Sequence, residues 1–109
     1  MDRLRQADGF LYASNYLDAT VSYAVASSWF LKLGKEPLVH KSIEQISKQC
    51  LRQLTQEHLE MPSRAFLGIP VRGHLNTLLG ELEKADENAR YTLEIAEMRS
   101  AIRQAEQRK

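Results

Sequence analysis

The sequence has few cysteines, prolines and glycines, and few aromatic side chains. Its 109 residues include one cysteine, three prolines and five glycines, and aromatic residues make up 7%. The lone Cys50 excludes an internal disulfide framework, and the scarcity of proline and glycine excludes a collagen-like or low-complexity chain. Hydrophobic residues at 43% and charged residues at 27% are typical of a globular domain. We therefore predict one domain over residues 1–109.

The sequence also lacks an excess of charge of either sign. Lys and Arg number 15 against 14 Asp and Glu, and each sign contributes seven residues through Glu60. Proteins that bind nucleic acids need clustered positive charge to neutralise phosphates. Aromatic side chains that could stack on bases, such as Tyr16 and Trp29, lie in a segment without Lys or Arg from Asp8 to Phe30. The sequence therefore disfavours a nucleic-acid partner.

Long hydrophobic runs are absent as well. The richest segment, residues 17–33, is interrupted by Asp18 and Lys32, whereas a transmembrane helix needs about 18 apolar residues in succession. The first residues include Arg3 and Arg5 instead of the apolar stretch of a secretion signal. Together with the single cysteine, these absences lead us to expect no membrane partner and a reducing, cytoplasmic location.

The sequence has no glycine-rich phosphate loop and no nucleophile elbow. Its histidines, His40, His58 and His74, are far apart, and Cys50 falls on an apolar stripe. Zinc sites usually require paired ligands at short spacing. We therefore expect no metal site and no cofactor, and we disfavour a small-molecule enzyme.

Apolar residues recur at spacings of three and four along most of the chain, and strand-like alternation is sustained nowhere. This pattern predicts an all-α bundle of about four helices with a long C-terminal helix. The first two helices are predicted over residues 2–13 and 16–33, and Ser14 with Asn15 favours a bend between them over one continuous helix. Residues 16–33 are apolar or small on nearly every face, so this helix should be the most buried.

Gly34 and Pro37 end the second helix and open a third, predicted over residues 37–60. Its apolar side chains are spaced by four, three, four and four residues, at Val39, Ile43, Ile46, Cys50 and Leu54. Residues 62–73 follow as an apolar loop with two prolines and two glycines. Such a loop packs across a bundle or contacts a partner, and we favour packing because large exposed apolar patches are uncommon in monomers.

One long last helix is predicted over residues 74–106. Its apolar side chains form a coiled-coil-like seam at Leu75, Leu78, Leu82, Ala85, Ala89, Leu93 and Ala96. A helix of about 30 residues is about 45 Å long, which is more than the other helices can cover. Part of the seam therefore needs a partner, which would be a second copy of the chain or another helical protein. The predicted interface residues are Leu75, Leu78, Leu82, Leu93, Phe66 and Leu67.

The sequence ADGFLYASNYLDA at residues 7–19 continues through SYA at 22–24 to LKLG at 31–34. This stretch resembles the first helical hairpin of HEPN-type domains, and it is also similar to tetratricopeptide-like hairpins and to short archaeal helical proteins. HEPN domains are small helical bundles, often dimeric, that include RNA-cleaving toxins and their inactive relatives. The resemblance ends at Gly34 and implies a helical bundle.

HEPN nucleases carry an arginine followed four to six residues later by a histidine, and RQLTQEH at residues 52–58 has this spacing. The resemblance implies that Arg52 would stabilise a phosphate and that His58 would act as acid or base in RNA cleavage. Gln53 departs from the small polar residue or histidine that is usual after the arginine. On an unbroken helix the two side chains would point about 120° apart, so they converge only if the helix ends between them.

Two functions from different classes remain. The first is a non-enzymatic helical module for protein–protein interaction, or an adaptor, which associates with itself through the seam. The alternative is an HEPN-like RNA-cleaving domain, or an inactive relative, with Arg52 and His58 as its catalytic pair. We favour the first, because an exposed arginine and a histidine near a helix end are also ordinary structural features.

Overall fold

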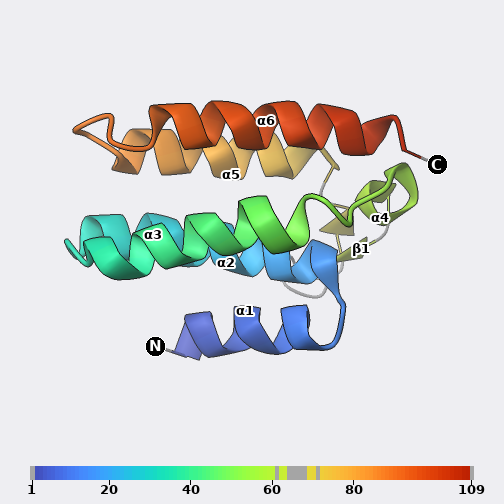
Figure 1. The fold of residues 1–109 in the computed structure, drawn as a ribbon, viewed down its shortest axis with the longest axis horizontal. Helices are drawn as coiled ribbons and strands as arrows, with labels where there is room; N and C mark the ends of the chain where they lie inside the picture. The colour runs from blue at the N-terminus through green and yellow to red at the C-terminus, as the bar shows by residue number, and fades with distance from the viewer. Residues whose placement is uncertain (1, 61, 64–68, 71, 109) are drawn as a thin grey trace.

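The computed structural model describes residues 2–60, 62–63, 69–70 and 72–108. Its central helix is α2 (Tyr16–Lys32), which contacts α1 (Asp2–Tyr12), α3 (Glu36–Gln45) and α5 (Arg72–Ala85). Figure 1 shows α2 and α3 as a middle layer, with α1 on one side and α5 and α6 (Thr92–Glu106) on the other. The predicted all-α helical bundle is confirmed.

Helix α2 is buried along most of its length because its small side chains let three helices approach closely. Ala19, Ala26 and Ser27 are completely buried, and dense packing of this kind leaves little empty space. The helix begins at a cap in which the side-chain oxygen of Asn15 accepts a hydrogen bond from the backbone N–H of Asp18. The Asn15 amide also donates to the Asp18 carboxylate at 2.6 Å, so this buried acid has a partner.

Helix α1 turns back onto α2 at residues 13–15, where Ser14 has a φ of 60°. The chain therefore bends between these helices, as Ser14 and Asn15 indicate in the sequence. The Tyr23 hydroxyl donates a hydrogen bond to the Asp8 carboxylate and so ties α2 to α1. Burial and this bond raise the pKa of Tyr23 well above its ordinary value.

The segment predicted as one helix over residues 37–60 is interrupted, which corrects that expectation. Helix α3 continues into a π-helical turn, η1 (Ile46–Cys50), where the Leu51 N–H donates to the Ile46 carbonyl. A turn then leads to the short α4 (Gln56–Glu60). The apolar spacing misses this break because Leu51 and Leu54 are both buried, and a helix or a turn can bury them equally well.

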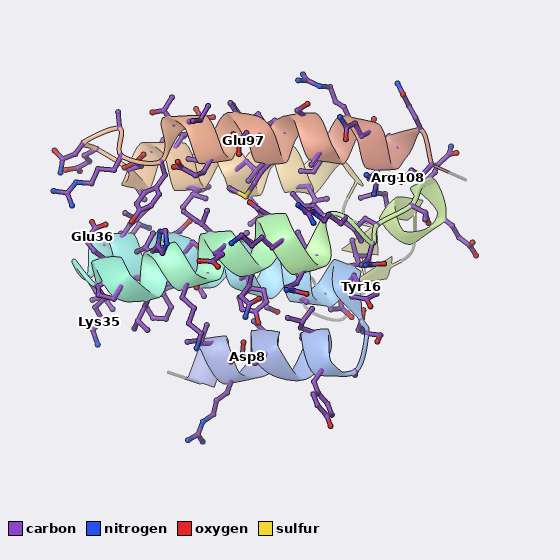
Figure 2. The ribbon with its side chains drawn as sticks, in the orientation of Figure 1. Asp8, Tyr16, Lys35, Glu36, Glu97 and Arg108 are labelled. Carbon is purple, nitrogen blue, oxygen red and sulfur yellow. The ribbon has the colours of Figure 1, made fainter. Side chains whose placement is uncertain are left out.

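Arg108 fills the gap that this break opens in the backbone hydrogen bonding. Its guanidinium donates to the carbonyls of Leu51, Arg52 and Leu54 at 3.2, 2.8 and 3.2 Å. The Arg108 carbonyl in turn accepts a hydrogen bond from the Gln56 N–H at 2.9 Å. Carbonyls at a helix end have no partner within the helix, so a positively charged donor stabilises them. Figure 2 shows Arg108 at the end of α6, beside α4.

Part of the predicted loop 62–73 forms a minimal antiparallel pair, β1 (Pro62–Ser63) with β2 (Ile69–Pro70). Phe66 and Leu67, which we predicted to contact a partner, lie outside the described residues. Within the described part of the chain, no helix combines the length and the apolar character needed to cross a membrane.

The long helix predicted over residues 74–106 is instead a hairpin of α5 and α6. Asp86 is 7% exposed, and its carboxylate accepts hydrogen bonds from the N–H groups of Arg90 and Tyr91 at 3.0 and 2.8 Å. Ala89, with a φ of 52°, completes the reversal. Folding back lets both short helices bury their apolar stripes within the chain. The backbone N–H groups that the break leaves without helical partners donate to the carboxylate of Asp86 instead.

We predict that Arg108→Ala lowers the free energy of unfolding by about 1–2 kcal/mol, because three carbonyls lose a charged donor. Hydrogen exchange should rise first in residues 51–60. Arg5→Ala, at an arginine that is exposed whereas Arg108 is half-buried, should change the free energy of unfolding by no more than about 0.5 kcal/mol. Equal effects of the two substitutions in urea denaturation would contradict a stabilising role for Arg108.

Candidate functional site

The apolar seam of α5 packs inside the chain. Leu75 is 2% exposed and Leu82 is completely buried, and both belong to the hydrophobic core. Leu78 is partly buried against the same core. These side chains were predicted as interface residues because one long helix would have left them uncovered. In the hairpin these side chains are covered by the rest of the chain, so they do not need a partner to bury them.

Leu93, the remaining predicted interface residue that the structure describes, is 66% exposed. The buried stripe of α6 contains Ile95, Met98, Ile102 and Ala105. Because successive residues of a helix are about 100° apart, Leu93 lies about 200° around the helix from Ile95 and faces outward. Ala96 and Ser100 share this outer face, so Leu93 protrudes beside small side chains.

A groove of about 450 Å³ lies between α5 and α6, on a flank of α6 about 90° around the helix from Leu93. Its lining residues are Glu83, Asp86, Ala89, Thr92, Ile95, Ala96, Arg99 and Arg103. Asp86 lies at the hairpin end, and Arg103 lies in the last turn of α6, at the opposite end. Between them Glu83 and Arg99 form an ion pair across the two helices. The groove therefore has small side chains along α6 and one ion pair across it, while the Asp86 carboxylate at its end is buried and bonded to backbone N–H groups.

A second cleft, of about 350 Å³, lies where the start of α3 meets the hairpin. There the Tyr91 hydroxyl donates to Glu36 at 2.7 Å, and the Arg90 guanidinium lies 3.5 Å from the same carboxylate. Figure 2 shows Glu36 at this end of the bundle. Burial, followed by the bond to Glu36, raises the pKa of Tyr91 to about 12. Tyr91 therefore stays protonated at neutral pH and serves to join α3 to the hairpin.

The structure separates Arg52 and His58 by a turn, because η1 ends before Arg52 and α4 begins at Gln56. Arg52 and His58 therefore do not share one unbroken helix, and the separation of about 120° expected on such a helix does not apply. Arg52 is exposed and lines a cleft of about 210 Å³ together with Arg108 and Glu97. The side chain of His58 lies outside what the structure describes, so convergence of the pair stays a prediction.

Cys50 is completely buried in the core, and burial raises the pKa of its thiol to about 11. A thiol of this kind is protonated at neutral pH and is a poor nucleophile. Among the residues that the structure describes, no group of three or more His, Cys, Asp or Glu side chains could hold a metal ion.

No family model matches the chain, and neither a curated protein nor a solved structure matches it. The candidate site therefore rests on the geometry of the chain alone. In this geometry the outer face of α6 combines an exposed leucine with small side chains, and a groove lies on the neighbouring flank, between α6 and α5.

Sequence analysis found Leu93 but missed the groove beside it. The spacing of Ala96, Arg99 and Arg103 by three and four residues places them on one helix face, and this signal is present in the sequence. Glu83 could not be assigned to the same face, because only the reversal at Asp86 brings α5 alongside α6.

We predict that Tyr91→Phe lowers the free energy of unfolding by about 1 kcal/mol at pH 7, because Glu36 loses its donor. The pKa of Tyr91 rises from 10 in the unfolded chain to about 12 in the folded chain, so its contribution is complete below pH 10 and disappears as the pH approaches about 12. Urea denaturation between pH 8 and 12 should thus show a weaker alkaline decline in the variant. A Tyr12→Phe control, at a side chain that is 95% exposed, should follow the unmodified chain.

Proposed function

We propose that this chain is a non-enzymatic helical module for protein–protein interaction that associates with a second copy of itself through the outer face of α6. The observation that supports this function best is Leu93, which is 66% exposed on the outer face of α6. The core residues of the hairpin are already covered within the chain. The outer face of α6 is the part of the predicted seam that is still available to a partner.

The chemistry of this face suits an interface between two proteins. Full burial of a leucine side chain contributes about 1.5–3 kcal/mol, so each copy gains by covering Leu93. Interfaces combine an apolar centre with a polar rim, and here Glu83 and Arg103 border the small side chains of α6. A reducing, cytoplasmic location suits the chain, because Cys50 is a free and buried thiol.

We predict that Leu93→Asp shifts the chain from dimer to monomer, because a carboxylate would have to be buried without a partner. The measurement is the mass in solution by size-exclusion chromatography with light scattering over a dilution series. Leu33→Asp is a matched control, since Leu33 is 60% exposed but lies at the end of α2.

The two variants separate three results. Loss of the dimer in Leu93→Asp with retention in Leu33→Asp supports the proposed surface. Loss of the dimer in Leu33→Asp with retention in Leu93→Asp would show that the chain associates through the end of α2 and not through α6. A monomeric unmodified chain at every concentration would overturn self-association.

A second candidate function is RNA cleavage by Arg52 and His58. The observation in its favour is the turn between η1 and α4, which contains Arg52 and keeps it off the helix that carries His58. In this reaction Arg52 would stabilise the developing charge on a phosphate, and His58 would transfer a proton.

Since we propose a non-enzymatic module, we predict that the purified chain does not cleave mixed RNA substrates, and that Arg52→Ala combined with His58→Ala leaves both this result and the mass in solution unchanged. Gel analysis of end-labelled RNA provides the measurement. Cleavage that is present in the unmodified chain and abolished in the double variant would instead establish the ribonuclease function.

A further inference from the structure

We infer that the cleft between η1 and the end of α6 binds the phosphate group of a small molecule, an activity that does not rest on the proposed function. The cleft has a volume of about 210 Å³. Hydroxyl, amide and guanidinium donors line it together with apolar side chains, and its lining residues are Ser47, Leu51, Arg52, Glu97, Met98, Ala101, Gln104 and Arg108. Proteins bind oxyanions with donors of this kind, and with arginine above all.

Two guanidinium groups line this cleft without an acidic partner. The Arg108 guanidinium donates to the Arg52 carbonyl at 2.8 Å, so the two residues are in contact. Among the described residues, no carboxylate lies within ion-pair distance of either guanidinium. Arg108 uses only Nη1 for the three carbonyls, which leaves Nε and Nη2 as donors. Like charges in one cleft repel each other, and an anion bound by both relieves the repulsion.

The π-helical turn explains why Ser47 and Arg52 line the same cleft. On an α-helix, side chains five residues apart point about 140° away from each other. In η1 the Leu51 N–H donates to the carbonyl of Ile46, so residues five apart come closer to one face. Such π-helical turns are frequent at functional sites. The turn thus places a hydroxyl and a guanidinium on one wall of the cleft, while Arg108 comes from the end of α6.

A phosphate group matches these donors better than a carboxylate does. Its oxygens are tetrahedral, so one phosphate accepts hydrogen bonds from both walls of the cleft, whereas the two oxygens of a carboxylate lie in one plane. Glu97 also lines the cleft, but it precedes Gln104 by seven residues, or about 10 Å along the helix axis. The apolar side chains of Met98 and Ala101 lie between them. Glu97 therefore weakens the binding of an anion without blocking the site.

The test is a titration of the full chain with inorganic phosphate, followed by nitrogen–proton correlation NMR at about 20 mM salt, because higher salt screens exposed charges. Amide signals of residues 47–53 and 104–108 should shift and saturate, with a dissociation constant on the order of 1–10 mM. Dimethyl phosphate, a diester with one negative charge, represents the phosphates of a nucleic-acid backbone. It should bind at least about fivefold more weakly, because two of its oxygens are esterified.

Four variants show whether binding depends on the cleft. Arg52→Ala should bind phosphate at least about tenfold more weakly, because a charged donor is lost. Arg52→Lys keeps the charge but not the planar fork, so it should recover part of the affinity. Glu97→Gln should bind about two- to threefold more tightly, because a like charge is removed. Arg5→Ala, at an exposed arginine on α1, is the matched control and should bind like the unmodified chain.

Folding is checked by the thermal melting temperature, which Arg52→Ala should leave unchanged because this side chain is exposed. Saturable shifts that weaken in Arg52→Ala but not in Arg5→Ala support the site. The absence of saturable shifts up to about 50 mM phosphate, or equal weakening in both variants, would overturn it. Equal affinity for dimethyl phosphate would overturn the assignment to a small phosphorylated molecule. None of these results depends on the mass in solution, so self-association is tested separately.

Discussion

The rest of the structure depends on the burial of α2. Its residues are small or apolar on nearly every face, so the helix is stable in water only when other helices cover it from several directions. Helices α1, α3 and α5 do so. Covering α2 from three sides brings the two halves of the chain together, and this requires breaks in segments whose apolar spacing alone would allow one long helix.

The two breaks are stabilised by polar bonds, each made by one side chain. Asp86 accepts two backbone N–H groups at the hairpin between α5 and α6. Arg108 donates to three carbonyls beyond η1. Both side chains satisfy backbone groups that would otherwise be unpaired near the core, which is costly in a folded protein. The break between α5 and α6 is therefore stabilised by an acidic side chain that accepts N–H groups, and the break after η1 by a basic side chain that donates to carbonyls.

These breaks also explain how much of the fold could be predicted from the sequence. The all-α class, the bend at Ser14 and Asn15, and the buried character of α2 follow from periodicity and capping, which act between neighbours in sequence. The reversal at Asp86 leaves the spacing of apolar residues almost unchanged, so periodicity gives no sign of it. The bonds of Arg108 join residues more than 50 positions apart, and local patterns carry no information about them.

The candidate site was predictable to a similar extent. Leu93 belongs to the predicted seam, but the prediction that Leu75 and Leu82 lie beside it on a partner surface assumed a continuous helix. The hairpin sends those two side chains into the core and leaves Leu93 outside. What remains for a partner is a smaller surface, on which Leu93 protrudes beside the small side chain of Ala96.

The most direct test of this account is the distance between spin labels in the associated protein, with labels introduced at exposed positions by Glu97→Cys on α6 or by Arg5→Cys on α1. Cys50 is completely buried and should not be labelled. Association through the outer face of α6 predicts a short distance between the two labels at position 97 and a longer distance at position 5, because α1 lies on the opposite side of the middle layer from α6 (Figure 1). Equal distances at the two positions, or no dipolar coupling at either, would contradict the account.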